Sequence, residues 1–130
     1  MQYFLAKTDP ENYSILDFEK EKQTTWSGVR NAQAVAALKA MKKGDKVFIY
    51  HSGEGSIVGL ASVIGNSRPD IKDERSWLVD FKFIKKFKEP FVNLRQIKET
   101  NLFNNFALVR QGRLSTMAVQ ENCVDWLKKK

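Results

Sequence analysis

Three apolar, strand-forming segments in the middle of the chain constrain its fold more than any other feature. Residues 46–52 (KVFIYHS) and 56–64 (SIVGLASVI) are rich in β-branched and aromatic side chains, and Gly53-Glu54-Gly55 separates them. Two such runs joined by a short glycine-bearing turn predict a β-hairpin. Residues 77–87 (WLVDFKFIKKF) alternate apolar and polar side chains, as a strand with one buried face does. The centre of the chain therefore predicts antiparallel sheet.

The flanking segments predict further short elements. Residues 3–7 (YFLAK) and 24–26 are expected to be extended, and strand residues are expected on both sides of Gln111-Gly112 within 107–119. Capping residues mark the expected helices. These helices are residues 15–22 after Ser14, 31–44 between Asn31 and Gly44, 94–99 after Asn93, and a closing helix from 121.

Together these elements indicate an α+β protein. Five or six short strands that turn back through hairpins, without regular βαβ alternation, favour a bent, mostly antiparallel β-barrel with an open edge over a doubly wound sheet. The chain has 130 residues, a common length for one domain, and it contains no internal repeat or linker-like tract. We therefore expect a single domain over residues 1–130, flanked by short helices.

Composition excludes some classes of site. Cys123 is the only cysteine and His51 the only histidine, so an internal disulfide and a Cys/His zinc site cannot form. We expect no metal and no cofactor. No apolar run approaches a membrane span, and the N-terminus lacks the pattern of a signal peptide, so we expect a protein of the cytoplasm or the nucleus, with the cytoplasm favoured, that does not bind membranes. We also expect a monomer.

The chain is basic, with 22 Lys and Arg against 15 Asp and Glu and a net charge of +7. This excess favours a polyanionic partner such as nucleic acid. A solvated surface explains the charge equally well.

Four polar clusters follow predicted strands or precede predicted helices. They are Lys7-Thr8-Asp9, Trp26 to Asn31, Tyr50-His51-Ser52 and Arg110 to Ser115. Each has a structural explanation alone: Asp9 suits a turn before Pro10, and Asn31 suits a helix cap. Strand ends of a small barrel can converge, however, so the four clusters together define one candidate site.

Trp26 admits two interpretations. Its rings need apolar cover and its indole N–H needs a partner, yet its neighbours in the sequence are small and polar. The ring either points into the core or offers a stacking surface to a flat ligand. Arg30 and Asn31 support the second interpretation, because a guanidinium can hold phosphate and a carboxamide can meet a base edge.

Catalytic motifs are weak. Gly53-Glu54-Gly55 has the wrong spacing for a phosphate-binding loop, and no serine occupies a nucleophile elbow. His51 either lines the rim of a pocket or makes structural hydrogen bonds.

The chain resembles the EVE domain family of the PUA-like superfamily, which includes the thymocyte nuclear protein group and is related to YTH and ASCH domains. YFLAKTDP, TTWSGVRNAQA, LKAMKKGDKVFIYHS, IVGLASVI, RPD and ALVRQGRLS match EVE motifs in order and span nearly the whole chain. The resemblance implies a PUA-like bent barrel that binds DNA or RNA and takes a modified base, foremost 5-methyl- or 5-hydroxymethylcytosine, into a pocket. The implied pocket residues are Lys7, Thr8, Asp9, Trp26, Gly28, Val29, Arg30, Asn31, His51, Ser52, Arg110, Gln111, Arg113 and Ser115.

In the mechanism expected from this resemblance, the base is extruded from the helix and Trp26 stacks on it. Polar groups around Asn31 and Ser52 read its edge, and Arg30, Arg110 and Arg113 hold phosphates. The enzymatic alternative is an ASCH-like amidohydrolase acting on modified cytidine, with Lys7 activating Thr8. A protein-binding adaptor is a third reading, which nothing in the sequence supports.

Overall fold

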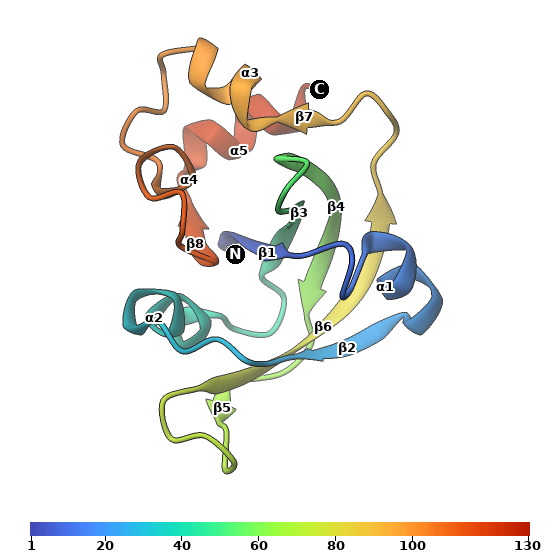
Figure 1. Cartoon of the computed structure of the whole chain (residues 1–130), viewed down its shortest axis with the longest axis vertical. Helices are drawn as coiled ribbons and strands as arrows, with labels where there is room; N and C mark the ends of the chain where they lie inside the picture. Colours follow the sequence, from blue (N-terminus) through green and yellow to red (C-terminus); the bar gives the residue numbers. More distant parts are fainter.

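The apolar runs form the central strands of a strongly bent sheet in the computed structural model, which describes residues 1–130 (Figure 1). Six strands are paired in the order β2-β6-β4-β3-β1-β8, and two very short strands add to it, β5 on β6 and β7 on β4. The strands are β1 (Tyr3–Thr8), β2 (Gln23–Trp26), β3 (Lys46–His51), β4 (Ser56–Val63), β5 (Arg68–Pro69), β6 (Trp77–Lys86), β7 (Val92–Asn93) and β8 (Thr116–Val119).

The sheet is mostly antiparallel and open, as the sequence predicted. Strands β3 and β4 form the expected hairpin, and β1 pairs with β3 in parallel, the single parallel pair. Strands β2 and β8 lie at the two ends of the order and do not pair with each other. The parallel pair brings the carboxyl ends of β1 and β3 to the same edge, which is where two of the predicted polar clusters begin.

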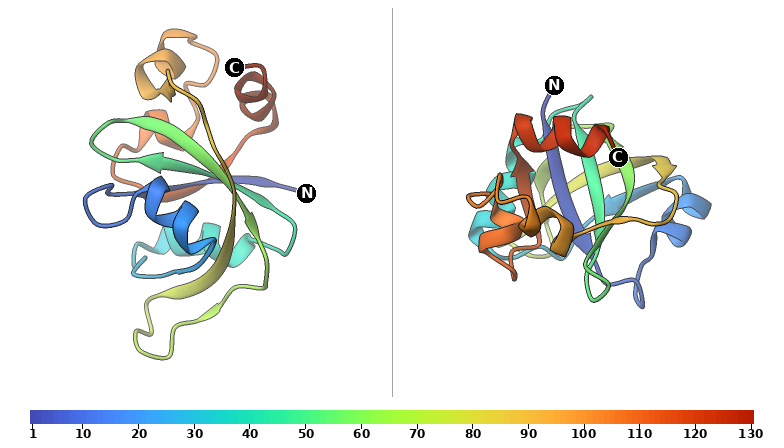
Figure 2. Two further views of the ribbon diagram at one scale, coloured as in Figure 1. Left: turned by 90° about the vertical axis from the view of Figure 1, so that its right-hand side faces the viewer. Right: turned by 90° about the horizontal axis from the view of Figure 1, so that it is seen from above.

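Helices lie on both sides of the central strands. Figure 2 shows α3 and α5 on one side and α1 and α2 on the other. The helices are α1 (Ile15–Glu21), α2 (Ala32–Ala40), α3 (Leu94–Glu99), α4 (Ala107–Arg110) and α5 (Glu121–Lys128). None of them has the length and apolar character needed to span a membrane.

The two-sided cover explains the sequence pattern of the strands. Consecutive residues of a strand point to opposite faces. In β1, Phe4, Leu5 and Ala6 are all fully buried, because helices cover both faces. Strand β6 instead buries Val79 and Phe81 and exposes Lys82 between Phe81 and Phe83. One core of 31 buried apolar residues joins the elements.

Capping signals located the helix starts well. Ser14 forms a reciprocal capping box with Asp17, Asn93 forms one with Gln96, and Asn31 accepts hydrogen bonds from two backbone N–H groups at the start of α2. The predicted end of α2 at Gly44 is wrong, because the helix stops at Ala40. The Asp45 carboxylate accepts the backbone N–H groups of Lys42 and Gln2, and this holds residues 42–45 in a turn.

Two other expectations also require correction. The segment before Gln111 is the short helix α4 rather than a strand; Phe106 and Leu108 anchor it in the core. The sequence also gave no indication of the short strands β5 and β7, whose pairing depends on distant partners.

Candidate functional site

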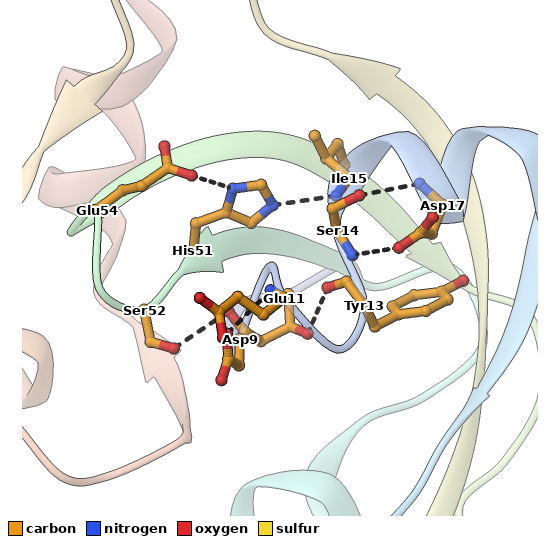
Figure 3. Close-up of polar contacts among 10 residues, drawn as sticks. Asp9, Glu11, Tyr13, Ser14, Ile15, Asp17, His51, Ser52 and Glu54 are labelled. Atoms are coloured by element: carbon orange, nitrogen blue, oxygen red, sulfur yellow. Dashed lines mark hydrogen bonds and ion pairs between the residues drawn. The ribbon is translucent and has the colours of Figure 1, made fainter.

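The predicted site begins where β1 and β3 end side by side. The parallel register pairs Lys7 with Tyr50 and Thr8 with His51. Just beyond the strands, the backbone N–H of Ser52 donates to the Thr8 carbonyl at 2.9 Å, and the Ser52 hydroxyl donates to the same oxygen at 3.3 Å. The clusters at Lys7–Asp9 and at His51–Ser52 therefore form one structure. Figure 3 shows in close-up how Asp9, His51 and Ser52 lie in it.

Both ring nitrogens of His51 are occupied by the protein itself. Nε2 accepts the backbone N–H of Ile15, the first residue of α1, at 3.0 Å (Figure 3). Nδ1 lies 3.1 Å from the Glu54 carboxylate. Since Nε2 is an acceptor, the proton resides on Nδ1 and points to Glu54. The residue is 6% exposed. Of the two readings of His51, this geometry matches the structural one.

The turn between β1 and α1 is built from short hydrogen bonds. The Asp9 carboxylate accepts the N–H of Glu11 at 3.0 Å, as a turn before a helix requires. The Thr8 hydroxyl donates to the carbonyl of Tyr13 at 2.7 Å. At the start of α1, hydrogen bonds from the Ser14 backbone and, less strongly, its side chain lower the pKa of Asp17. The turn is therefore held in a defined shape beside the two strand ends.

Lys7 points to the other face of the sheet and fixes the fourth cluster. Its ammonium group donates to the carbonyl of Gly112 at 2.8 Å and lies 5.5 Å from the centre of the Tyr50 ring. Its backbone N–H donates to Ser115. Burial lowers the pKa of Lys7. This contact brings the segment Arg110 to Ser115 to the end of β1.

The same geometry separates the two groups of the enzymatic alternative. Lys7 and Thr8 are consecutive in β1, so their side chains lie on opposite faces of the sheet. The lysine bonds to Gly112 and the threonine to Tyr13. A lysine-activated threonine is not assembled, and no group of three His, Cys, Asp or Glu side chains is placed to hold a metal ion.

Trp26 lies in the core at the end of β2. Its ring packs against Phe81 at 5.1 Å between centres, and Tyr13 approaches it edge-on at 6.3 Å. Only 9% of the residue is exposed. The indole N–H makes no hydrogen bond within the protein. It is nevertheless not among the buried side-chain polar atoms that lack a partner, since Ser76 Oγ is the only one of these. The indole N–H is therefore not fully buried, and it belongs to the small part of Trp26 that remains accessible.

The residues after Trp26 are largely engaged in contacts within the protein. Gly28 has a φ of +78°, which favours glycine, and Val29 is buried. The Arg30 guanidinium binds the Asp73 carboxylate at 2.6 Å. The pKa of Asp73 is lowered, chiefly by the backbone N–H of Arg75 and then by Arg30. The Asn31 carboxamide oxygen caps α2 at 2.9 and 3.1 Å.

The four clusters thus form two groups, which differ in how many of their side chains are free to bind a ligand. The first, here called the strand-end site, comprises Lys7, Thr8, Asp9, His51 and Ser52 together with the attached segment Arg110 to Ser115. The second is Trp26 to Asn31, which Tyr13 links to the first through its contact with Trp26. Arg110, Gln111 and Arg113 are exposed, and their side chains make no hydrogen bond or ion pair within the protein. They are the groups of the set left free for a ligand.

Sequence reasoning missed Tyr13 and Asp73, which hold the second group in place. Neither had a local signal, because both contacts depend on folding. The sequence also did not predict the positions of the cavities in the structure. Three cavities, of about 760, 500 and 500 Å³, are lined by none of the individually predicted site residues, although Leu114 of the segment Arg110 to Ser115 borders the first. The polar side chains of the strand-end site therefore lie outside these three cavities.

The bent, open sheet with helices on both faces, and a polar site where its parallel strands end, define a small PUA-like α+β domain. The EVE domain model matches residues 2–129, and the chain belongs to the EVE domain family. The sequence is similar to thymocyte nuclear protein 1 from human (30% identity, 96% of this chain and 72% of that protein) and from rat (34%, 74% and 55%). The chain thus spans about half the length of the rat protein.

Solved structures show the same fold. A protein from Rhodopseudomonas palustris superposes with a TM-score of 0.90 at 33% identity, covering 99% of this chain and 92% of that one. The human THYN1 protein in complex with 5-methylcytosine containing DNA superposes with a TM-score of 0.89 at 25% identity, covering 99% and 96%. Both the α+β class and the EVE assignment are confirmed.

Proposed function

We propose that this EVE domain binds nucleic acid at the strand-end site and accommodates a modified cytosine, foremost 5-methylcytosine, between this site and Trp26. The observation that carries the proposal is the segment Arg110 to Ser115, which Lys7 holds against the end of β1 while its two arginines remain without acidic partners. The human relative in complex with 5-methylcytosine containing DNA shares the fold over nearly all of this chain, which supports DNA as the polymer.

Arg110 and Arg113 are the proposed phosphate contacts. A guanidinium that is exposed and unpaired can bind a phosphate in a bidentate manner without first breaking an ion pair. Arg30, which the sequence also suggested for this role, is bonded to Asp73 and would have to exchange that carboxylate for phosphate. We therefore assign the main phosphate contacts to the first two arginines.

The base is proposed to lie beside Trp26 and Ser52. Because Phe81 and Tyr13 cover most of the indole, its accessible N–H edge is the part that meets the base, as a hydrogen-bond donor. Stacking over the whole ring would require Tyr13 to move. The 5-methyl group carries no charge, so burying it contributes about 0.8 kcal/mol, or roughly a fourfold preference.

Contacts to phosphates are expected to supply much of the affinity. Extruding a base costs a few kcal/mol, and contacts to that base return an amount of similar size. Neutralising phosphates releases counterions, so the logarithm of the affinity for duplex DNA should fall with the logarithm of the salt concentration, by about 0.9 per contact. Binding is expected to be tight at low salt and weak at high salt.

The test is fluorescence anisotropy with labelled duplexes that carry one central cytosine, 5-methylcytosine or 5-hydroxymethylcytosine, and with an RNA of the same sequence. The wild type should prefer a modified duplex. Arg110→Gln/Arg113→Gln should reduce the salt slope by about 1.8 and weaken all duplexes together. Lys42→Gln/Lys43→Gln is the matched control, because both lysines are exposed and lie at the opposite end of β3. Equal affinity for all three duplexes would overturn modified-base recognition, and equal loss in both double variants would overturn the assignment of the site.

A further inference from the structure

A second cavity, away from the strand-end site, has the composition of a ligand pocket. It encloses about 500 Å³ between the end of β6, the segment leading to β7 and the carboxyl end of α5. In Figure 1 these three parts of the chain lie toward the upper end of the molecule. Its walls include the buried Phe48 and the half-buried Phe87 and Phe91. The rings of Phe48 and Phe87 lie 6.4 Å apart.

Four lysines surround this aromatic hollow: Lys85, Lys86, Lys88 and Lys130. All four are exposed, and none takes part in any of the ion pairs of the protein. Glu89 is the one acidic residue of the lining. The ammonium group of Lys85 lies 5.5 Å from the centre of the Phe87 ring, so the charged rim and the aromatic wall are in contact. We call this the lysine-rimmed pocket.

Charge and shape together restrict the occupant. Several unpaired cations around one opening favour a ligand with more than one negative charge, and aromatic walls favour a flat or apolar group between those charges. Unpaired nucleotides have this arrangement, since each base is flanked by phosphates. Proteins that bind single strands without sequence preference combine a basic groove with aromatic side chains that stack on bases.

We propose that the lysine-rimmed pocket binds an unpaired nucleotide of a single-stranded nucleic acid, with its base against Phe87 and Phe91 and its flanking phosphates on the lysines. The ligand needs no modification and no contact with Trp26. The inference therefore goes beyond the modified-base site and stands independently of it.

The two sites share strand β3. Phe48 of the pocket and His51 of the strand-end site are three residues apart in β3, which is about 10 Å along the strand at the usual rise. Ile57, another lining residue, pairs with Tyr50, the ring beneath Lys7. An unpaired stretch of a few nucleotides spans this distance. A base extruded at one site and a neighbouring unpaired base at the other can therefore belong to the same opened segment.

The test measures binding of an unmodified, labelled, twelve-nucleotide thymidine strand by anisotropy at several salt concentrations. Lys85→Gln/Lys88→Gln should weaken binding at least tenfold at low salt and reduce the salt slope by about 1.4, since each phosphate contact contributes about 0.7 for single strands. Phe91→Leu should weaken binding at least threefold and leave the salt slope unchanged, because it removes the aromatic face and retains apolar volume. Far-ultraviolet circular dichroism and thermal unfolding identify variants that remain folded.

Lys42→Gln/Lys43→Gln again supplies the matched loss of two charges. If this control weakens binding as much as the pocket variants do, general electrostatic attraction explains the binding and the proposal is overturned. Wild-type affinity in the pocket variants would overturn it as well. Vesicles containing phosphatidylserine test the other anionic partner. Retention on them that depends on Lys85 and Lys88, without any effect of these lysines on the thymidine strand, would also overturn the proposal. The preference for 5-methylcytosine duplexes, measured on the same variants, should not change. If the wild type shows no such preference, only the proposed modified-base site is contradicted.

Discussion

Nε2 of His51 accepts a hydrogen bond from the backbone N–H of Ile15, and this bond fastens the start of α1 to the end of β3. The two residues are 36 positions apart in the sequence. The first N–H groups of a helix have no partner within the helix, and here a side chain from the sheet supplies one. The contact also holds the turn that carries Thr8, Asp9 and Tyr13 beside the strand ends.

Removing the imidazole should therefore destabilise the protein. His51→Ala leaves the buried N–H of Ile15 without a partner and creates a cavity, and we expect it to lower the free energy of unfolding by about 2–3 kcal/mol. Urea unfolding followed by circular dichroism measures this change. Glu54→Gln is the matched variant, because it alters only the half-exposed partner at Nδ1 and should cost less than about 1 kcal/mol. Equal effects of the two variants would mean that the bond to Ile15 contributes little.

Gly59 in β4 has no room for a side chain. A Cβ at this position would come within 2.8 Å of the backbone oxygen of Lys85 and 2.5 Å of the Ile15 side chain. Since the backbone of β6 cannot yield as a flexible side chain can, Gly59→Ala should lower the free energy of unfolding by about 2–3 kcal/mol. Gly65→Ala is the control, with nothing within 4 Å, and should change stability by less than about 1 kcal/mol. Similar urea midpoints for the two variants would contradict the close approach.

Cys123 should be chemically silent in the folded protein. The residue is fully buried in α5, and burial raises the pKa of its thiol to about 12. An exposed thiol ionises near pH 8.5. The folded state therefore keeps the neutral thiol, and this contribution to stability is present below pH 8.5 and is lost as the pH rises toward 12. Reaction with a thiol-specific disulfide reagent at pH 8 should follow the unfolded fraction as urea is added. Rapid reaction without urea would show that the thiol is accessible.

The sequence predicted those parts of the structure that depend on neighbouring residues. Ser14, Asn31 and Asn93 marked helix starts because a cap bonds to N–H groups two or three positions away. Gly44 failed as a helix end because the turn there depends on Asp45, whose carboxylate also binds the N–H of Gln2 across the fold. Local chemistry therefore located the elements better than it located their ends.

The same distinction applies to the candidate site. The four clusters were found because strand ends carry polar residues, and the parallel pairing of β1 with β3 brings two of them together. The engagement of Arg30 by Asp73 and the cover of Trp26 by Phe81 depend on residues 43 and 55 positions away. No local pattern reports such partners, so the sequence could not separate the free arginines from the engaged one.

The accessible edge of Trp26 leads to a specific expectation for Trp26→Phe. This variant keeps an aromatic ring against Phe81 but removes the indole N–H, the only part of the side chain for which the structure leaves a hydrogen bond unmade. Losing one such bond to a base should weaken binding of a 5-methylcytosine duplex by about twofold to tenfold, from about 0.5–1.5 kcal/mol. Tyr13→Phe is the control, because it removes only the hydroxyl that donates to Glu21. Anisotropy titrations measure the affinity of each folded variant for the 5-methylcytosine duplex. If Trp26→Phe binds as the wild type does while Arg110→Gln/Arg113→Gln binds weakly, the base does not meet the indole edge, and the contact must be assigned to the polar groups of the strand-end site.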